Sequence, residues 1–365
     1  LEAHIRQRQP KLIVPLDDDT LQVVSGKDSL HKYHLSILPS VVPNVDGKVI
    51  PLLSPDYINR VYSDLPFLVR GMRRLKEELE VPGLNYTKRD YIIRPTFAQV
   101  IDYLRRCYNA DHLSIDIETA HGQITCCGFA PTPTSAISIP LEPKDWPTEE
   151  LHQLWSAIAH VMAGPSRKVM QNHIFDATYF SRYGIQVNNM WMDTMLAQKF
   201  LYQELSADLA TIARLWTREP YWKDEGRKWK PEDGLDQYYI YNAKDTAVTL
   251  EAAFRMEREL NARKLWQPFQ SLVMDLVGPS SEMCWHGLPI DEDERQKLLG
   301  EYTASAEKLT SDINAHVEPL MGKPLNPRSP KQVKEFLTAR KYRLPVKKGK
   351  ETSDVTALLK LQIKY

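Results

Sequence analysis

Alternating apolar and polar residues in the middle of the chain predict a β-sheet. Residues 113–119 read LSIDIET, with an apolar side chain at every second position. Side chains two apart in a strand share one face, so one face of this segment is apolar and the other polar. Three further short apolar runs, at 123–130, 135–141 and 168–172, have the length of strands. We therefore expect a sheet built from these four segments.

Apolar residues spaced three and four apart predict helices on both sides of these strands in the sequence. The helix beginning at Pro147 is well signalled, with early acids at its start and Gly164-Pro165 after its end. A sheet surrounded by helices is an α/β arrangement. The predicted helices cover residues 64–80, 96–110, 147–162, 174–184, 192–205, 207–216 and 235–260.

The chain divides into three parts by pattern. A length of 365 residues favours two or three domains. Residues 1–90 form a small α/β part with short strands at 10–16 and 48–55. The predicted sheet and its helices occupy 95–262, and 265–365 is mostly helical. In that last part a helix is expected at 291–321, with Leu298, Tyr302, Leu309, Ile313, Val317 and Leu320 along one stripe, and another at 326–341, with Ser329 as its cap.

Composition and charge exclude some functions. The chain has 47 basic and 47 acidic residues, so a nucleic-acid partner would have to be held by local charge. No apolar stretch approaches the ~18 residues that span a bilayer. The opening LEAHIRQRQP does not resemble a secretory leader, and we expect a cytoplasmic protein without membrane contact. The four cysteines lack zinc-ligand spacing and are expected to be free thiols.

The polar face of LSIDIET carries two neighbouring carboxylates. Asp116 and Glu118 point the same way, and like charges side by side cost stability unless a cation or a proton lies between them. A lone D-x-E pair is usually no more than a solvated face. Further acids at helical spacing make a solvated face a less adequate explanation of the pair. Asn172 and Asp176 are four residues apart at a helix start, and Tyr241 and Asp245 are four apart on the long helix, each pair on one helix face.

The ordered set D-x-E, N-x-x-x-D and Y-x-x-x-D resembles the three motifs of the 3′–5′ exonucleases that use four acids and a tyrosine. MDTMLAQ (192–198) and YNAKDTAVTLE (241–251) look like the matching stretches of the proofreading domain in family A DNA polymerases, the DNA polymerase I type. The resemblance covers roughly residues 95–260. It implies a ribonuclease H-like exonuclease domain with a mixed sheet and flanking helices.

The resemblance also implies a chemistry. Clustered carboxylates suit hard divalent cations, so two Mg²⁺ or Mn²⁺ ions are expected as cofactors. Asp116, Glu118 and Asp245 would hold the first ion, and Asp116 would bridge to the second. Asp176 would support the second ion through water. Tyr241 would orient the attacking water, because a phenol is a poor base near neutral pH. Thr119 and Asn172 would contact the 3′-terminal nucleotide.

The C-terminal part resembles the polymerase segment that follows this exonuclease. SSEMCWHGLPIDEDERQKLL and PLNPRSPKQVKEFL look like the base of the thumb in family A polymerases. His286 and Asp291 have the spacing of an alternative catalytic motif, but within this match they read as a turn before a helix.

No palm-like motif occurs in the 365 residues, which are therefore expected not to polymerise DNA and to be a fragment. A basic segment could bind duplex phosphates, with a solvated face as the alternative: Lys331, Lys334, Arg340, Lys341, Arg343, Lys347, Lys348 and Lys350.

Two other segments yield weaker interpretations. Residues 1–90 faintly resemble the second half of a uracil-DNA glycosylase, where Ser54-Pro55 stands at the place of a His-Pro-Ser motif. We expect a remnant without glycosylase activity, as in bacteriophage polymerase fusions, or an unrelated structural domain. The loop 219–234 holds Tyr221, Trp222, Lys223, Arg227 and Trp229, which could stack on frayed bases or pack on the surface.

The sequence thus predicts a metal-dependent 3′–5′ exonuclease acting on the single-stranded 3′ end of DNA, as the proofreading part of a polymerase whose remaining chain is a partner. A 3′ RNA-trimming enzyme of the RNase D kind is the first alternative, because it uses the same acids. A catalytically dead nucleic-acid-binding module is the second alternative, which the complete set of acids disfavours.

Overall fold

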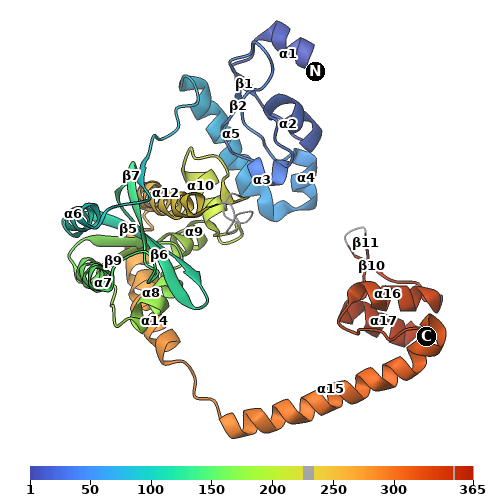
Figure 1. Cartoon of the computed structure of the whole chain (residues 1–365). Coiled ribbons are helices and arrows are strands. Elements are labelled where there is room, and N and C mark those ends of the chain that lie inside the picture. The colour runs from blue at the N-terminus through green and yellow to red at the C-terminus, as the bar shows by residue number, and fades with distance from the viewer. Residues whose placement is uncertain (225–233, 348–349, 365) are drawn as a thin grey trace. The chain divides into compact units, whose positions relative to one another are not determined.

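The computed structural model of the chain describes residues 1–224, 234–347 and 350–364. It divides into two compact units, Leu1–Gly287 and Leu288–Tyr365. Each unit is described by itself below, because only their internal arrangement is determined (Figure 1).

The first unit is built on a mixed six-stranded sheet with the order β4-β7-β6-β5-β8-β9. Strand β5 pairs antiparallel with β6 and parallel with β8. The four predicted strands are confirmed, and two short edge strands are added. The bounds are β4 Asp90–Ile92, β5 His112–Ala120, β6 Gln123–Thr132, β7 Ser135–Pro140, β8 Arg167–Met170 and β9 Met190–Asp193.

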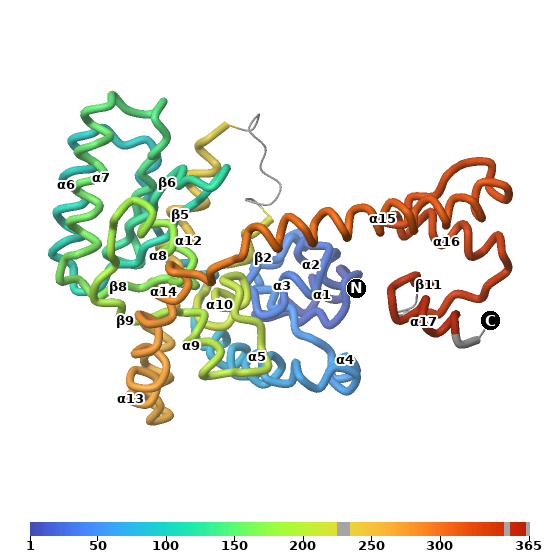
Figure 2. The backbone as a smooth tube through the Cα atoms, turned by 90° about the horizontal axis from the view of Figure 1, so that it is seen from below, coloured from blue at the N-terminus to red at the C-terminus, as the bar shows by residue number. Residues whose placement is uncertain are grey.

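Two helices cover the apolar face of this sheet. The alternation in β5 buries Leu113, Ile115 and Ile117 in one core with side chains of α6 (Phe97–Tyr108) and α7 (Thr148–Ala163). Figure 2 shows α6 and α7 lying side by side along this flank of the sheet. The core forms as the period-two pattern predicts, because the apolar half of each strand has a helix to pack against.

The long helix α12 (Leu235–Ala262) lies against the opposite face of the sheet, over β5, β6 and β7. The strand side chains beneath it are small, and Ala130 and Ala136 pack on Ala243 and Ala247 of the helix. At Gly128 the approach is so close that a Cβ atom would lie 2.2 Å from the hydroxyl of Thr246. Small residues therefore allow α12 to lie directly on the polar face of β5.

Three shorter helices follow the parallel edge of the sheet. Helix α8 (His173–Arg182) begins immediately after β8, and α9 (Thr194–Leu201) begins immediately after β9. Helix α10 (Leu209–Trp216) follows α9. The sequence pattern predicted a helix from 192, so strand β9 corrects the start of that element. Its four residues are too few to show an alternation before the helix begins.

The N-terminal part contains a small sheet, β1-β3-β2, five α-helices and the 3₁₀-helix η1 (Tyr62–Asp64). Two of the three strands, β1 and β3, and the helix α5 were predicted, whereas β2 was not. Its core is continuous with that of the exonuclease-like part, since Leu35 and Leu52 belong to the same cluster as Leu215 and Val248. The bounds are α1 Glu2–Arg8, β1 Leu12–Ile13, α2 Asp18–Ser25, α3 Leu30–Tyr33, β2 Leu38–Pro39, β3 Lys48–Val49, α4 Pro55–Arg60 and α5 Leu65–Glu80.

Short helical turns lead from α12 to the end of the first unit. They are α13 (Trp266–Pro268), η3 (Phe269–Val273) and η4 (Met274–Leu276), followed by the helix α14 (Val277–His286). Cys284 on α14 is exposed, whereas Cys107, Cys126 and Cys127 are buried, and all four thiols are free.

The second unit is mostly helical, as expected. Asp291 caps α15 (Glu292–Met321) by accepting from the Glu294 amide at 3.0 Å, so the turn-and-helix interpretation of this segment is confirmed. Ser329 caps α16 (Pro330–Ala339), which is followed by β10 (Val346–Lys347), β11 (Lys350–Glu351) and α17 (Val355–Lys364). Of the six residues in the predicted apolar stripe of α15, only Val317 is buried among the described residues. In residues 1–224, 234–347 and 350–364, we find no helix that is both long and apolar enough to cross a bilayer.

Candidate active site

Strand β5 places two acids beneath helix α12. Asp116 pairs in register with Gly128 of β6, and Glu118 pairs with Cys126, so both side chains leave the sheet on the face that α12 covers. The register shifts between Glu118 and Thr119. This irregularity gives the end of the strand a bend directly after the second acid.

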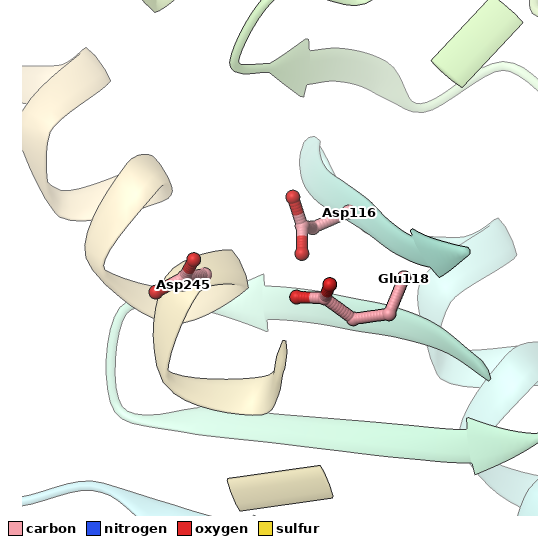
Figure 3. Close-up of side chains that lie close together, drawn as sticks. All are labelled: Asp116, Glu118 and Asp245. Carbon is pink, nitrogen blue, oxygen red and sulfur yellow. The ribbon is translucent and has the colours of Figure 1, made fainter. Parts of the chain in front are cut away.

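Helix α12 brings a third acid to the same point. Asp245 is 5% exposed, and its side chain points back toward β5 (Figure 3). Oxygen atoms of Asp116, Glu118 and Asp245 all lie within 4.8 Å of one another. Two neighbouring acids of β5 and a distant acid of α12 therefore form one carboxylate cluster, in which the family resemblance had placed them together.

The carboxylates of β5 are strongly destabilised as anions. Burial, together with the neighbouring charge of Asp245, raises the pKa of Asp116 to about 7. Burial and the charges of Asp116 and Asp245 raise the pKa of Glu118 to about 9. Clustered anions in a poorly solvated place hold protons unless a cation replaces them. The cluster thus has the electrostatic character of a cation site.

Asp176 approaches the cluster from helix α8. Its Oδ1 atom accepts a hydrogen bond from the backbone amide of Ile117 at 3.2 Å, so it lies against the strand residue between Asp116 and Glu118. The side chain is 3% exposed. Burial and the charge of Asp116 raise the pKa of Asp176 well above its usual range. The fourth predicted acid therefore lies against β5 next to Asp116, whereas the three-acid cluster consists of Asp116, Glu118 and Asp245.

The turn that starts α8 is held by an acid that the sequence pattern did not single out. Asn172 has a left-handed backbone conformation with φ of 65°. The carboxylate of Asp193 accepts from the amides of Asn172 at 3.2 Å, His173 at 2.8 Å and Met195 at 2.8 Å. Asp193 thereby ties the first turn of α8 to that of α9. An aspartate closing an apolar run before a helix was the signal for this cap.

The segment before residue 225 enters the site, which sequence reasoning missed. The indole nitrogen of Trp222 donates to Oδ1 of Asp245 at 2.8 Å, and the Lys223 ammonium forms an ion pair with Oδ2. Lys223 also donates to the phenol oxygen of Tyr241 at 2.8 Å. Burial opposes the charge of Lys223, but Asp245 and Tyr241 more than compensate and raise its pKa. The cluster thus has one cation supplied by the chain itself.

This contact corrects the suggested stacking of Trp222 on frayed bases. The Trp222 side chain is 2% exposed and lies in the main core, so its ring is not available to a nucleic acid. Of the other four residues in that suggestion, Arg227 and Trp229 lie outside the described residues.

The donor set fits a hard divalent cation. Two ligand oxygens on opposite sides of an ion are up to ~5.2 Å apart around Ca²⁺ and ~4.2 Å apart around Mg²⁺. The 4.8 Å spread of the three carboxylates lies between these limits, so a shift of ~0.6 Å brings them to the distance that Mg²⁺ requires. All three ligands are carboxylates, which Mg²⁺ and Mn²⁺ prefer over the nitrogen and sulfur ligands that zinc favours. The cluster can therefore hold a metal ion of this class.

Comparisons with known proteins agree with this geometry. Residues 91–261 match a family model described as a 3′–5′ exonuclease, of the DNA polymerase A type. Among solved structures, the chain is similar to the POL domain of Pol1 from M. smegmatis, at 16% identity and a TM-score of 0.48 over 75% of this chain, and it spans 45% of that protein's length.

Two nuclease structures are also similar. The catalytic core of RRP6 from Trypanosoma brucei is 17% identical over 51% of this chain and 53% of its own, with a TM-score of 0.41. The EXO domain of Aedes aegypti Nibbler is 18% identical over 48% of this chain and 90% of its own, with a TM-score of 0.36. Residues 91–261 thus match a 3′–5′ exonuclease domain of the DNA polymerase A type.

Proposed function

We propose that the chain hydrolyses phosphodiester bonds at the 3′ end of DNA in a metal-dependent reaction, and that it is the proofreading part of a family A polymerase. The observation that carries this proposal is the convergence of Asp116, Glu118 and Asp245 within 4.8 Å, inside the span that matches the exonuclease family. Three clustered acids, of which Asp245 alone forms an ion pair among the described residues, would be costly for a purely structural domain to maintain.

Two divalent ions, Mg²⁺ or Mn²⁺, are the proposed cofactors. Asp116, Glu118 and Asp245 would hold one ion, and Asp116 with Asp176 would serve the other. When bound, such a pair of ions supplies charge stabilisation to the attacking and leaving oxygens of an in-line displacement. The position of Asp176 against the Ile117 amide supports its share in the second site.

Tyr241 is proposed to position the attacking water. Burial and the charge of Asp245 raise the pKa of Tyr241, so its phenol keeps its proton near neutral pH. A protonated phenol can hold a water molecule in place but cannot abstract its proton. Thr119, at the register shift within β5, and Asn172, at the start of α8, are proposed to contact the terminal nucleotide.

The second unit is proposed to contact the duplex from which the 3′ end frays. Four of its basic residues, Lys331, Arg340, Lys341 and Arg343, are exposed. Exposed lysine and arginine side chains bind phosphates without reading sequence. The remainder of a polymerase chain is the proposed protein partner.

The test is nucleotide release from single-stranded DNA in the presence of Mg²⁺. The double substitution Asp116→Ala and Glu118→Ala should lower the rate by about 10²–10³-fold or more, because transition-state charge would lose its support. Asp236→Asn on the exposed first turn of α12 is the matched control and should leave the rate unchanged. A double variant that still degrades DNA at the original rate would refute the proposed site.

The choice of substrate separates the alternatives. Substrates labelled at the 5′ end should yield a ladder that shortens from the 3′ end, for DNA in preference to RNA. Faster degradation of RNA would favour the RNA-trimming alternative. Binding of DNA without any hydrolysis in Mg²⁺ or Mn²⁺ would favour the binding module.

A further inference from the structure

Helix α12 presents a buried amide to the cluster, one residue after Tyr241. Asn242 is 0% exposed. Its side-chain nitrogen donates to Oδ2 of Asp116 at 2.9 Å and to the Asp116 backbone oxygen at 3.2 Å. Its side-chain oxygen accepts from the hydroxyl of Ser138 on β7 at 2.7 Å. These contacts form a chain that runs from Ser138 through Asn242 to Asp116.

The contacts determine the orientation of the amide. If its nitrogen and oxygen were exchanged, the amide oxygen would face two acceptor oxygens of Asp116. The Ser138 hydroxyl, which can donate, matches the amide oxygen on the other side. Asn242 therefore has a donor facing the acid and cannot reverse without losing hydrogen bonds in a buried place.

A glycine on β6 allows the Asn242 amide to approach Asp116. Gly128 lies opposite Asp116 in the register, and a Cβ atom there would lie 2.8 Å from the side-chain oxygen of Asn242. The helix residue thus occupies the space that a side chain at position 128 would need. The combination of a glycine on β6 and a short polar residue on α12 places the amide within hydrogen-bond distance of the acid.

We infer that Asn242 is a positioning residue for Asp116, which it holds in the rotamer that the metal cluster requires. The inference rests on the proposed metal-dependent function. One oxygen of Asp116 is occupied by the Asn242 donor, and the hydrogen bond fixes the rotation of the carboxylate about its Cβ–Cγ bond. Partners that orient metal ligands in this way typically contribute 10–100-fold to metal affinity or activity.

A residue that only packs the helix on the sheet would behave differently. Truncation of such a residue, which does not push the helix away from the sheet, would lower thermal stability but leave the affinity for a divalent ion unchanged. The measurement is therefore the binding of Mn²⁺ to the whole chain without nucleic acid, followed by the electron paramagnetic resonance signal of free Mn²⁺. Thermal unfolding of each variant is recorded alongside.

Asn242→Ala should weaken Mn²⁺ binding about 10-fold or more. Ser138→Ala, which removes only the support of the amide, should weaken it about 2–10-fold, as the loss of one neutral hydrogen bond does. Thr249→Val, at another buried polar position on α12, is the matched control and should change stability without changing Mn²⁺ affinity. In nuclease assays, Asn242→Ala should lower kcat while KM for single-stranded DNA changes less than about twofold.

The outcomes distinguish this inference from the proposed function. Wild-type protein that neither binds Mn²⁺ nor releases nucleotides would refute the proposed function itself. Suppose instead that the wild type binds Mn²⁺ and releases nucleotides. If Asn242→Ala and Ser138→Ala then match its Mn²⁺ affinity and its kcat within about twofold, the role of Asn242 is refuted. If Asn242→Ala does not fold, Ser138→Ala decides by the same criterion.

Discussion

The ammonium group of Lys223 forms an ion pair with the Asp245 carboxylate, one of the three acids of the cluster. The pair occupies one oxygen of a proposed metal ligand, while the indole of Trp222 occupies the other. At ~4 Å, an ammonium group and a divalent ion would repel each other by about 8 kcal/mol at an effective dielectric constant of ~20. A metal ion and Lys223 therefore compete for Asp245.

Lys223→Met should accordingly bind divalent ions more tightly than the wild type. Breaking a hydrogen bond to a charged group costs about 1.5–3 kcal/mol, so the expected gain is about 10–100-fold in affinity. Titration calorimetry with Mn²⁺ measures it. Lys199→Met is the control, because the ammonium of Lys199 contacts backbone oxygens outside the site. Equal or weaker binding by Lys223→Met would contradict the competition.

Stability should depend on pH through the acids of β5. In the unfolded chain, carboxylates ionise near pH 4, whereas burial and neighbouring charge raise the pKa of Asp116 to about 7 and that of Glu118 to about 9 in the folded chain. Between these values the folded state holds more protons than the unfolded state. The contribution of these acids to stability therefore falls as pH rises from about 4 to about 9 in the absence of divalent ions.

Added Mg²⁺ should reverse this trend, since ionised acids bind it and protonated acids do not. The rise in Tm caused by Mg²⁺ should grow between pH 6 and pH 9, compared with samples in EDTA. Asp116→Asn combined with Glu118→Gln should lose this pH dependence. A rise in Tm of the same size at pH 6 and at pH 8.5 would argue against metal binding at these acids.

Gly128→Ala should disturb the cluster from a position that contains no charge. The added Cβ would lie 2.2 Å from Thr246 and 2.8 Å from Asn242, so α12 would have to move away from β6. Overpacking of this kind costs about 1–3 kcal/mol in the free energy of unfolding. Because Asp245 moves with the helix, Mn²⁺ affinity should fall as well. Gly300→Ala on α15, where a Cβ meets nothing within 4 Å, is the control and should be neutral or slightly stabilising.

Arg74 should be essential for joining the N-terminal part to the rest of the first unit. Its guanidinium is buried and donates to the backbone oxygens of Leu35, Arg214, Leu215 and Thr217. Arg74→Met would leave these acceptors without that donor, and we expect the free energy of unfolding to fall by about 3–5 kcal/mol. Urea denaturation measures the change, with the exposed Arg73→Met as control. A fall of less than 1 kcal/mol would show that the two parts are held together by other contacts.

The predicted elements were mostly recovered, and the exceptions have physical causes. The end of strand β9, Met192–Asp193, was taken for the start of a helix because Asp193 is also the cap of α9. The stripe on α15 was identified as an apolar face, yet among the described residues only Val317 in it is buried. Periodicity reveals that a face is apolar but not which surface covers it.

The contacts of the acids were less predictable than the acids themselves. Lys223 and Trp222 lie about twenty residues before Asp245, in a polar and aromatic loop with no regular spacing. Asn242 was visible only as the residue between Tyr241 and Ala243. The sequence did contain a signal for the role of Asn242. Gly128 and Ser138 are small residues on two neighbouring predicted strands, and small side chains on a sheet face allow a helix to lie close to it.

The sequence by itself determined the four inner strands of the sheet, its apolar face, and the two acids that share the polar face of β5, because these follow from the period of 2 residues along a single segment. The tertiary structure alone decided that Asp245 and Asp176 meet those acids, that Asn242 holds Asp116, and that Lys223 occupies Asp245. These contacts join residues far apart in the chain, and their geometry depends on how closely α12 and α8 pack on the sheet. Local periodicity does not encode that distance.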